Sequence, residues 1–256
     1  HPLSVASGIS VQDTIGVDSL MPLGSDWIND QARSILEDIE VAAFKCGLLG
    51  SAENIAIVAE IVADYPDIPL ILDPILASGR GDDLVDATMM RAMAELLFPH
   101  ALVITPNSYE ARRLVIRDEE EFMDLTLDEC ASRLKKLGCK NILITGTHEQ
   151  SDSVINTLYA STGQKIPYYW ERLPGSYHGS GCTLASAIAG CIARGLDFEE
   201  AIDEAQNFTW QTLKNAFKPG MGQFIPDRFF WIRRFNFVFL RGKFRRSYPN
   251  FFYYNG

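Results

Sequence analysis

A short glycine-rich segment, His178-Gly179-Ser180-Gly181-Cys182, is the part of the sequence best suited to binding an anion. Glycines let backbone N–H groups converge on an anion without obstruction by Cβ atoms. The run TLASAIAGCIARG that follows predicts a helix, whose N-terminus adds the positive end of a dipole. Such a loop suits the negative charge that develops on a transferred phosphoryl group. Close packing of the helix on a sheet would also explain the glycines, so both interpretations stay open.

Cys182 occupies the first turn of that predicted helix. A helix N-terminus stabilises a thiolate, so we expect a lowered pKa and a catalytic or redox role for its sulfur. A small buried residue at a crowded turn is the competing interpretation. A thiol redox protein has weak support, because no second cysteine lies adjacent in the sequence.

Polar residues follow two of the apolar runs. Asn107 comes directly after ALVITP, and Glu110 lies three residues on, which is the spacing of a capping box. Both would also lie at the carboxyl end of a strand, where α/β sheets bind ligands and carboxylates hold Mg²⁺ beside phosphates. Asp73 follows the run PLIL in the same way. We expect it to support the metal or a phosphate, although an Asp-Pro turn accounts for it as well.

Alternating strands and helices must position these residues. Short Val-, Ile- and Leu-rich runs predict buried parallel strands, and the stretches between them have helical spacing. In one such stretch Ile55, Val58, Ala59 and Val62 share a face, with Ser51 as N-cap. The sequence predicts a doubly wound α/β fold with a mainly parallel sheet and helices on both faces. The runs that predict strands are LSVASGISV, VAAFKCG, PLILDP, ALVITPN and NILITG.

The pattern changes after NILITG. SVINTLYAS and QKIPYYWERL predict an antiparallel hairpin at the sheet's edge, and residues 198–217 predict the last helix. We assign residues 1–227 to one domain. Residues 228–256 hold 12 of the 28 aromatic residues, seven Lys or Arg and no Asp or Glu. A patch that binds membranes or nucleic acid is one interpretation of this tail, and a non-native extension is the one we favour.

Composition narrows the class of protein. The net charge of −10 argues against general nucleic-acid binding. No run of 18 apolar residues occurs, so we expect no membrane-spanning helix. The five cysteines form no CxxC pair, and no histidine stands at metal-ligand spacing from them. They predict a reduced, cytoplasmic protein with free thiols and no zinc site.

Together, in this order, these segments resemble the hydroxymethylpyrimidine and phosphomethylpyrimidine kinases of the ribokinase superfamily. HGSGCTLASAIA is similar to the family's His-Gly-Thr-Gly-Cys-Thr-Leu, in which Cys replaces the superfamily's usual Asp. ITPNSYEA is similar to its Thr-Pro-Asn-x-x-Glu-Ala, and LILDPIL to its Asp-Pro-Val strand end. LSVASGISVQDTIGV, FKCGLLGS and ITGTH resemble the family's second-strand region, its Lys-x-Gly-Met-Leu and its Val-Lys-Gly-Gly-His. The resemblance runs from residue 3 to residue 217.

The resemblance implies ATP-dependent phosphorylation of 4-amino-5-hydroxymethyl-2-methylpyrimidine and of its monophosphate, in thiamine biosynthesis, with Mg²⁺. It implies small molecules as the partners, with neither nucleic acid nor membrane, and leaves a homodimer open. Gln12 would hydrogen-bond the aminopyrimidine, and Leu48 and Ile75 would line its pocket. The implied anion-hole residues are Gly179, Ser180, Gly181 and Cys182, with Cys182 near the hydroxymethyl group. The resemblance implies that Glu110 and Asp73 hold Mg²⁺ and that Thr145 and Gly146 lie along the nucleotide. Asn107 would contact both the metal shell and the nucleotide.

Two departures from the family pattern affect the expected activity. Thr145 and Thr147 stand where the family often has Lys and Gly, so a charge contact to phosphate is lost or comes from elsewhere. The family's first strand and glycine-rich lid have no counterpart in the sequence, so we expect an N-terminally truncated chain with reduced activity. A pyridoxine or pyridoxal kinase of the same fold and a non-catalytic nucleotide-binding fragment remain alternatives. Cys182 and Gln12 favour the pyrimidine.

Overall fold

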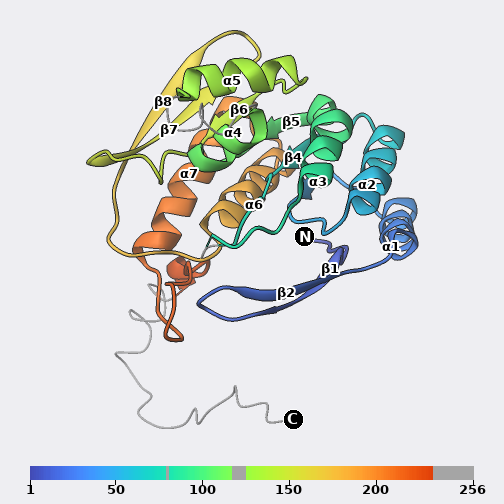
Figure 1. Cartoon of the computed structure of the whole chain (residues 1–256), viewed down its shortest axis with the longest axis horizontal. Helices are drawn as coiled ribbons and strands as arrows, with labels where there is room; N and C mark the ends of the chain where they lie inside the picture. Colours follow the sequence, from blue (N-terminus) through green and yellow to red (C-terminus); the bar gives the residue numbers. More distant parts are fainter. Residues whose placement is uncertain (79–80, 117–124, 233–256) are drawn as a thin grey trace.

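A six-stranded sheet forms the centre of the molecule in the computed structural model, which describes residues 1–78, 81–116 and 125–232 (Figure 1). The strands lie side by side in chain order, with β3 through β6 parallel and the last two antiparallel. They are β3 (Phe44–Cys46), β4 (Leu70–Leu72), β5 (Ala101–Ile104), β6 (Ile142–Ile144), β7 (Ser153–Tyr159) and β8 (Lys165–Glu171).

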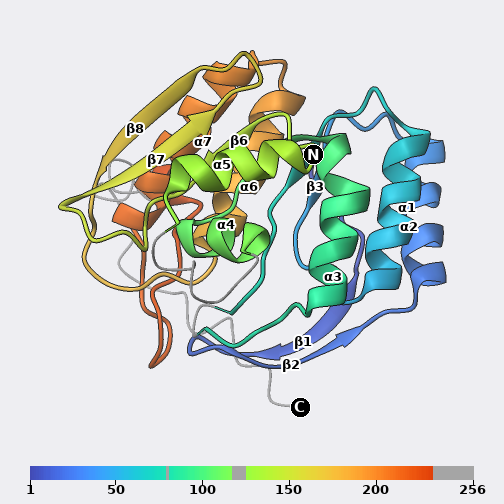
Figure 2. The ribbon, with the colours of Figure 1, turned by 45° about the horizontal axis from the view of Figure 1, so that its top comes forward.

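Helices cover both faces of this sheet (Figures 1 and 2). Leu70 and Leu72 face one apolar core, whereas Ile71 between them faces the other, as expected for buried strands. The doubly wound α/β prediction is therefore confirmed. The first face carries α2 (Ala52–Asp64), α3 (Ala87–Ala92), α4 (Ser108–Val115) and α5 (Leu127–Lys136), with α1 (Ser25–Asp38) packed on α2. The second face carries α6 (Ser180–Ala193) and α7 (Phe198–Lys214), and η1 (Met93–Leu97) and η2 (Phe98–His100) lead from α3 into β5.

Local sequence signals fix several element boundaries. The Ser51 hydroxyl accepts a hydrogen bond from Asn54 N at 3.1 Å, so the predicted N-cap of α2 is confirmed. Gly138, just beyond α5, has a φ of +98°, the left-handed conformation that ends many helices. The predicted hairpin is also confirmed as β7 and β8 at the sheet's edge.

The prediction that LSVASGISV is a buried strand of the parallel sheet is wrong. Its second half forms β1 (Gly8–Gln12), which pairs antiparallel with β2 (Val17–Pro22) in a separate two-stranded sheet (Figure 2). The Asp13 carboxylate accepts hydrogen bonds from Ile15 N and Gly16 N, and this turn reverses the chain into β2. The apolar residues of β1 alternate with polar ones and are exposed, and β3 becomes an edge of the main sheet.

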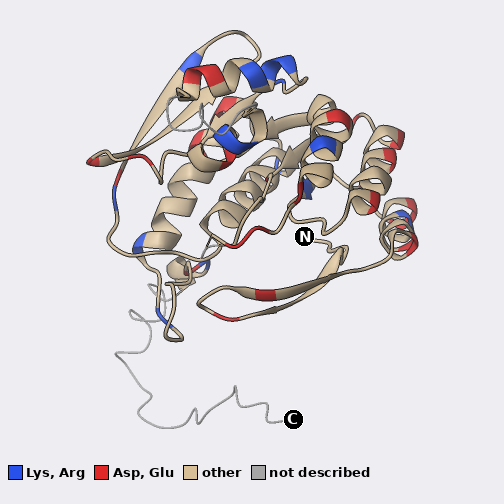
Figure 3. Ribbon diagram, in the orientation of Figure 1, with Lys and Arg blue, Asp and Glu red and all other residues tan. Residues whose placement is uncertain are grey.

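The first residues of the aromatic tail pack against α7. Asp227 N donates to Thr212 O at 3.0 Å, and the rings of Phe230 and Trp231 lie 6.2 and 5.8 Å from that of Phe208. The remainder of the predicted tail, 233–256, lies outside the described residues. None of the described helices is long and apolar enough to cross a membrane. Asp and Glu residues occur along α1 and α2 and along the β1–β2 hairpin (Figure 3).

Candidate active site

The carboxyl ends of three parallel strands bring the predicted polar residues together. Asp73 follows β4 directly and is 3% exposed. Asn107 follows β5 and forms a parallel bridge with Thr145, which follows β6. Thr145 N donates to Pro106 O at 3.0 Å, and Ser108 N donates to Thr145 O at 2.9 Å. The three residues therefore lie at the carboxyl ends of neighbouring parallel strands.

Residues 179–182, which we call the anion loop, form the N-cap and the first residues of α6 beside this edge. Gly179 is the N-cap, with a φ of +82° that favours glycine, and no side chain caps the helix. The N–H groups of Ser180, Gly181 and Cys182 lie in the first turn, where the helix offers them no acceptor. A Cβ on Gly181 would lie 3.8 Å from Asp73 Oδ1, so the loop and this carboxylate are neighbours.

A cation, a carboxylate and the thiol meet behind the anion loop. Lys45 Nζ lies 3.6 Å from Asp73 Oδ2, and Asp73 also interacts with Cys182. Gly47 makes room for the lysine, because a Cβ there would lie 2.6 Å from Lys45 Nζ. Lys45 stands within the FKCGLLGS segment, yet its role was missed because the strand gave no sign of which side chain faces the site.

The expected lowering of the Cys182 pKa is wrong. Burial, together with the negative charge of Asp73, raises the pKa of its thiol to about 11. Lys45 and Arg228 act in the opposite direction without overcoming burial. In the free protein the thiol is therefore protonated at neutral pH. Burial and the neighbouring Asp73 carboxylate outweigh the helix N-terminus, which would favour the thiolate.

Glu110 forms the capping box that the sequence predicted. Its Oε2 accepts from Asn107 N at 2.9 Å, and Asn107 Oδ1 accepts from Glu110 N at 2.8 Å. The Glu110 Oε1 atom accepts a longer bond from Leu76 N at 3.4 Å. Burial, with a smaller contribution from the nearby Asp73 charge, raises the pKa of Glu110 to about 7. The same carboxylate thus caps α4 and lies in the electrostatic field of Asp73.

The two acidic residues fit a divalent cation shared with a phosphate ligand. Asp73 Oδ2 is buried and has no hydrogen-bond partner among the described residues. Burial raises the pKa of Asp73, as it does that of Glu110, so a cation beside them would relieve the cost of two buried charges. Within the described ranges no group of three His, Cys, Asp or Glu side chains could hold a metal alone. Mg²⁺ suits such a site, since it is usually held by one or two carboxylates together with phosphates and water.

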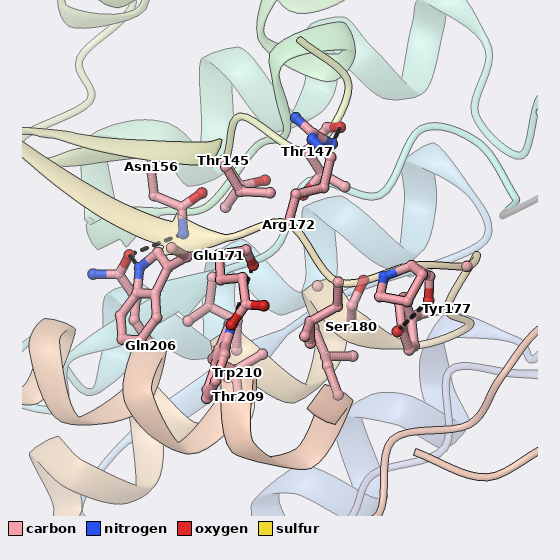
Figure 4. A pocket seen from close by; sticks show the side chains of 18 of the residues that line it. Thr145, Thr147, Asn156, Glu171, Arg172, Tyr177, Ser180, Gln206, Thr209 and Trp210 are labelled. Carbon is pink, nitrogen blue, oxygen red and sulfur yellow. Dashed lines mark hydrogen bonds between the residues drawn. The ribbon is translucent and has the colours of Figure 1, made fainter. Parts of the chain in front are cut away.

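A cavity of about 620 Å³ opens between the β7–β8 hairpin and α7 and reaches the anion loop at Ser180 and Gly181 (Figure 4). Such a volume is typical of a small-molecule site. Thr145, which the resemblance placed along the nucleotide, also lines it. Trp170 and Trp210 line the far part with ring centroids 6.3 Å apart.

A buried amide network fixes the floor of this cavity. Gln206, 2% exposed, accepts from Asn156 Nδ2 at 2.9 Å and from Trp170 Nε1 at 3.3 Å. Gly146 N donates to Asn156 Oδ1 at 3.1 Å. A Cβ on Gly146 would lie 2.2 Å from Ile155 O, so only glycine fits there. Gln206 was missed because its helical spacing indicated packing alone.

The loop after β6 is held by Arg172. Its Nη1, Nε and Nη2 donate to the carbonyl oxygens of Thr147, Ser151 and Glu149, each at 2.9 Å (Figure 4). Thr147, which departs from the family's glycine, is thus part of a braced loop at the cavity's rim. The guanidinium is occupied by these carbonyls.

The predicted pyrimidine contacts are not all brought together. Leu48 and Ile75 follow neighbouring strands, and Ile75 Cδ1 would lie 3.4 Å from a Cβ on Gly47, next to Leu48. Gln12 pairs with Val17 at the end of β1 and is exposed. A second cavity of about 340 Å³ lies between β2 and residues 82–84, and none of the three predicted residues lines it.

Comparison with known proteins agrees with this geometry. The family model described as phosphomethylpyrimidine kinase matches residues 1–227. The hydroxymethylpyrimidine/phosphomethylpyrimidine kinase of Haemophilus influenzae is 30% identical over 226 residues, covering 86% of this chain and 82% of that protein. The thiamine biosynthesis bifunctional protein ThiED of Geobacter sulfurreducens is 32% identical over 222 residues, or 86% of this chain. The chain spans only 44% of that longer protein.

Solved structures share the fold. The phosphomethylpyrimidine kinase of Clostridium difficile 630 superposes with a TM-score of 0.66 at 27% identity, covering 82% of this chain and 86% of that one. The pyridoxal kinase of Staphylococcus aureus, solved with AMP-PCP and pyridoxal, gives a TM-score of 0.74 at 25% identity. That match covers 88% of this chain and 81% of the pyridoxal kinase.

Proposed function

The chain belongs to the phosphomethylpyrimidine kinase family, and we propose that it phosphorylates 4-amino-5-hydroxymethyl-2-methylpyrimidine and then its monophosphate. Both steps would use ATP as the phosphoryl donor. One observation carries this proposal: a nucleotide-sized cavity ends at the open N–H groups of the anion loop. Donors placed where negative charge develops lower the barrier to phosphoryl transfer.

We propose that the nucleotide lies in the cavity with its phosphates toward Ser180 and Gly181. The base would then reach the part lined by Trp170 and Trp210, where aromatic rings offer stacking surfaces. Thr145 and Gly146 would follow the phosphate chain, and Asn107 would contact it at the strand ends. The direct neighbourhood of Asn107 and Thr145 supports this placement.

We propose Glu110 and Asp73 as the residues that hold Mg²⁺, in part through water. The Asp73 Oδ2 atom, which has no hydrogen-bond partner among the described residues, and the raised pKa of Glu110 support this assignment. When bound, the ion would neutralise charge on the phosphates. Glu110 keeps its capping bonds in this arrangement, because a capped carboxylate retains lone pairs for water.

Cys182 is proposed to contact the reacting hydroxyl. Because its thiol is protonated in the free protein, base catalysis requires the sulfur to ionise in the substrate complex. Lys45 and Arg228 are the neighbouring cations that favour the thiolate. The N–H groups of the anion loop would bind the oxygens of the transferred group.

The pyrimidine is proposed to bind beneath the β1–β2 hairpin, with Gln12 on its polar edge and Leu48 and Ile75 along its ring. Gln12 would have to approach those two residues when substrate binds. A pyridoxal kinase is the second candidate, favoured by the structural likeness to the S. aureus enzyme. The family match and the identity to pyrimidine kinases favour the first.

We propose a homodimer and a cytoplasmic location as the working state. Ile9, Val11 and Met21 on the β1–β2 hairpin are 56, 60 and 58% exposed, a grouping that suits contact with a second copy. The five cysteines are all free, which suits a reducing compartment. Light scattering after gel filtration would report the mass.

Isothermal titration tests the site separately from turnover. AMP-PNP with MgCl₂ should bind with one site per chain, and the aminopyrimidine alcohol should bind the resulting complex. Nucleotide binding without any binding of the alcohol or pyridoxal would indicate a non-catalytic nucleotide-binding protein and contradict the proposal.

A further inference from the structure

Three cations lie near the proposed path of the phosphates, and two are already engaged. Lys45 is paired with the buried Asp73 carboxylate. Arg172 directs Nε and both Nη atoms to backbone carbonyls of one loop. Arg228, the third of these cations, donates to a neutral hydroxyl and pairs with no carboxylate of the described residues. It is therefore the cation with charge to offer a ligand.

The backbone that carries Arg228 is fixed at the site. The preceding residue, Asp227, is 4% exposed, and its N–H donates to Thr212 O in α7 at 3.0 Å. Phe230 N donates to Asp227 O at 3.3 Å and closes a turn around the arginine. Phe230 then packs on Phe208. The arginine side chain therefore projects from a turn that is anchored to α7.

The guanidinium of Arg228 lies against the anion loop. Its Nε donates to Thr183 Oγ1 at 3.0 Å, and that hydroxyl donates to Gly179 O at 2.7 Å. Its Nη2 lies 3.2 Å from the point where a Cβ on Gly179 would be, so a side chain at 179 would crowd it. Neither Nη group of Arg228 has an acceptor within the described part of the chain. Both Nη groups therefore keep their N–H donors for a ligand, and Nη2 lies beside Gly179.

An independent observation marks this place as one that receives a ligand. Asp73, 3% exposed, keeps Oδ2 without a hydrogen-bond partner among the described residues, and its Oδ1 lies beside Gly181. The Lys45 ammonium lies 3.6 Å from Oδ2, beyond hydrogen-bond distance, so this buried oxygen can still accept a hydrogen bond from a ligand or contact an ion. The cavity also reaches the loop at Ser180 and Gly181.

We propose that Arg228 completes the anion loop by binding the oxygens of the phosphoryl group in transfer, an inference that rests on the proposed kinase function. A guanidinium presents paired donors that match two phosphate oxygens, and it stays charged throughout the reaction. It would supply the positive charge that Thr145 does not bring. No bond to Arg228 forms or breaks, and its contribution is electrostatic.

Steady-state kinetics on Arg228→Gln and Arg228→Lys test this role with both the alcohol and its monophosphate as substrates. Removing one charged donor should lower kcat about 100-fold for both substrates in Arg228→Gln, and less in Arg228→Lys. A loss confined to the KM of the monophosphate would place Arg228 on the phosphate already attached to the substrate and overturn the proposal. Unchanged kcat in Arg228→Gln would overturn it as well.

Two controls separate charge at the loop from other effects. Lys218→Gln removes a cation from the same C-terminal segment, where its Nζ lies 5.9 Å from the centre of the Phe224 ring, and should stay within twofold of wild type. Thr183→Val removes the hydroxyl that Arg228 holds and should cost less than Arg228→Gln. Equal losses in these two variants, at equal melting temperatures, would reduce Arg228 to a support for Thr183 and contradict the proposal.

Binding measurements keep the inference distinct from the proposed function. Titration of AMP-PNP with MgCl₂ should show about tenfold weaker binding to Arg228→Gln than to wild type, whatever alcohol the enzyme uses. If the wild-type protein did not turn over the pyrimidine alcohol, the proposed function would be wrong. The comparison of nucleotide affinity between wild type and Arg228→Gln would still be valid. If wild type and Arg228→Gln bound AMP-PNP equally well, and turned over any accepted substrate equally fast, the Arg228 proposal alone would be wrong.

Discussion

Lys45 Nζ lies 3.6 Å from Asp73 Oδ2, and this ion pair joins β3 to the end of β4 directly behind the anion loop. The side chain of Asp73 is 4% exposed and that of Lys45 23%, so water screens the pair only from the lysine side. Removing one partner of a buried pair leaves an uncompensated charge, which costs more than the pair itself contributes.

We expect Lys45→Met to lower the free energy of unfolding by about 3 kcal/mol, because Asp73 is left buried without its cation. Urea denaturation at neutral pH would measure this change. The double variant Lys45→Met with Asp73→Asn should recover most of the loss. Full additivity of the two single variants would show that the ion pair does not couple them.

Cys182→Ser is expected to lower kcat by about 10²–10⁴-fold, the usual contribution of a positioned base. Since burial and Asp73 raise the pKa of Cys182 to about 11, kcat/KM of wild type should rise with pH above 7. Cys182→Asp should retain more activity than the serine variant and lose most of that rise. A serine variant with wild-type turnover and an unchanged pH profile would leave Cys182 with packing alone.

Glu110→Gln keeps an oxygen for the Asn107 N–H and so retains the cap of α4, but it removes a negative charge. We expect the Mg²⁺ concentration for half-maximal rate to rise at least tenfold. Asp64→Asn removes a carboxylate that pairs with Arg33 far from the site, and it should leave Mg²⁺ dependence unchanged. Equal Mg²⁺ dependence in all three proteins would limit Glu110 to its capping role.

The same residue predicts how stability varies with pH without metal. Its pKa is about 7 in the folded protein and 4.5 for the ordinary carboxyl, so the folded state binds the proton more tightly. Its contribution to stability is full below pH 4.5 and is lost as the pH rises through 7. Relative to Glu110→Gln, wild type should lose up to about 3 kcal/mol between pH 5 and 8. Parallel pH–stability curves would contradict the raised pKa.

Gly146→Ala should impair both stability and nucleotide binding, because its Cβ would lie 2.2 Å from Ile155 O and displace the Asn156 bond. We expect a cost of about 1–3 kcal/mol, as for overpacking elsewhere. Gly190→Ala is the matched control, since nothing lies within 4 Å of a Cβ there and alanine favours the helix. Similar melting temperatures for the two variants would contradict the close packing at Gly146.

Strand–helix alternation and local caps made most of the fold predictable. Leu70, Ile71 and Leu72 belong to a continuous apolar run, which a strand buried on both faces requires. The N-terminal strand was misassigned because the apolar residues of β1 resemble such a run, whereas its partner is the local strand β2. A short apolar run does not specify whether the strand that pairs with it is the next one in the sequence or a distant one.

Site residues were predictable where an element end fixes their place. Asp73, Asn107 and Thr145 follow parallel strands, so their meeting at one edge follows from the topology. The roles of Lys45 and Arg228 depend on side-chain directions across elements far apart in sequence, which periodicity does not report. The Cys182 pKa was misjudged because the helix N-terminus could be read from sequence but burial beside Asp73 could not.

Substrate selectivity is the most direct test of the central claim. Purified chain with saturating MgATP should phosphorylate 4-amino-5-hydroxymethyl-2-methylpyrimidine with a kcat/KM at least tenfold above that for pyridoxal, with product identified by mass spectrometry. The Asp73→Asn variant, prepared in parallel, exposes any contaminating kinase. A kcat/KM for pyridoxal equal to or above that for the pyrimidine would contradict the account.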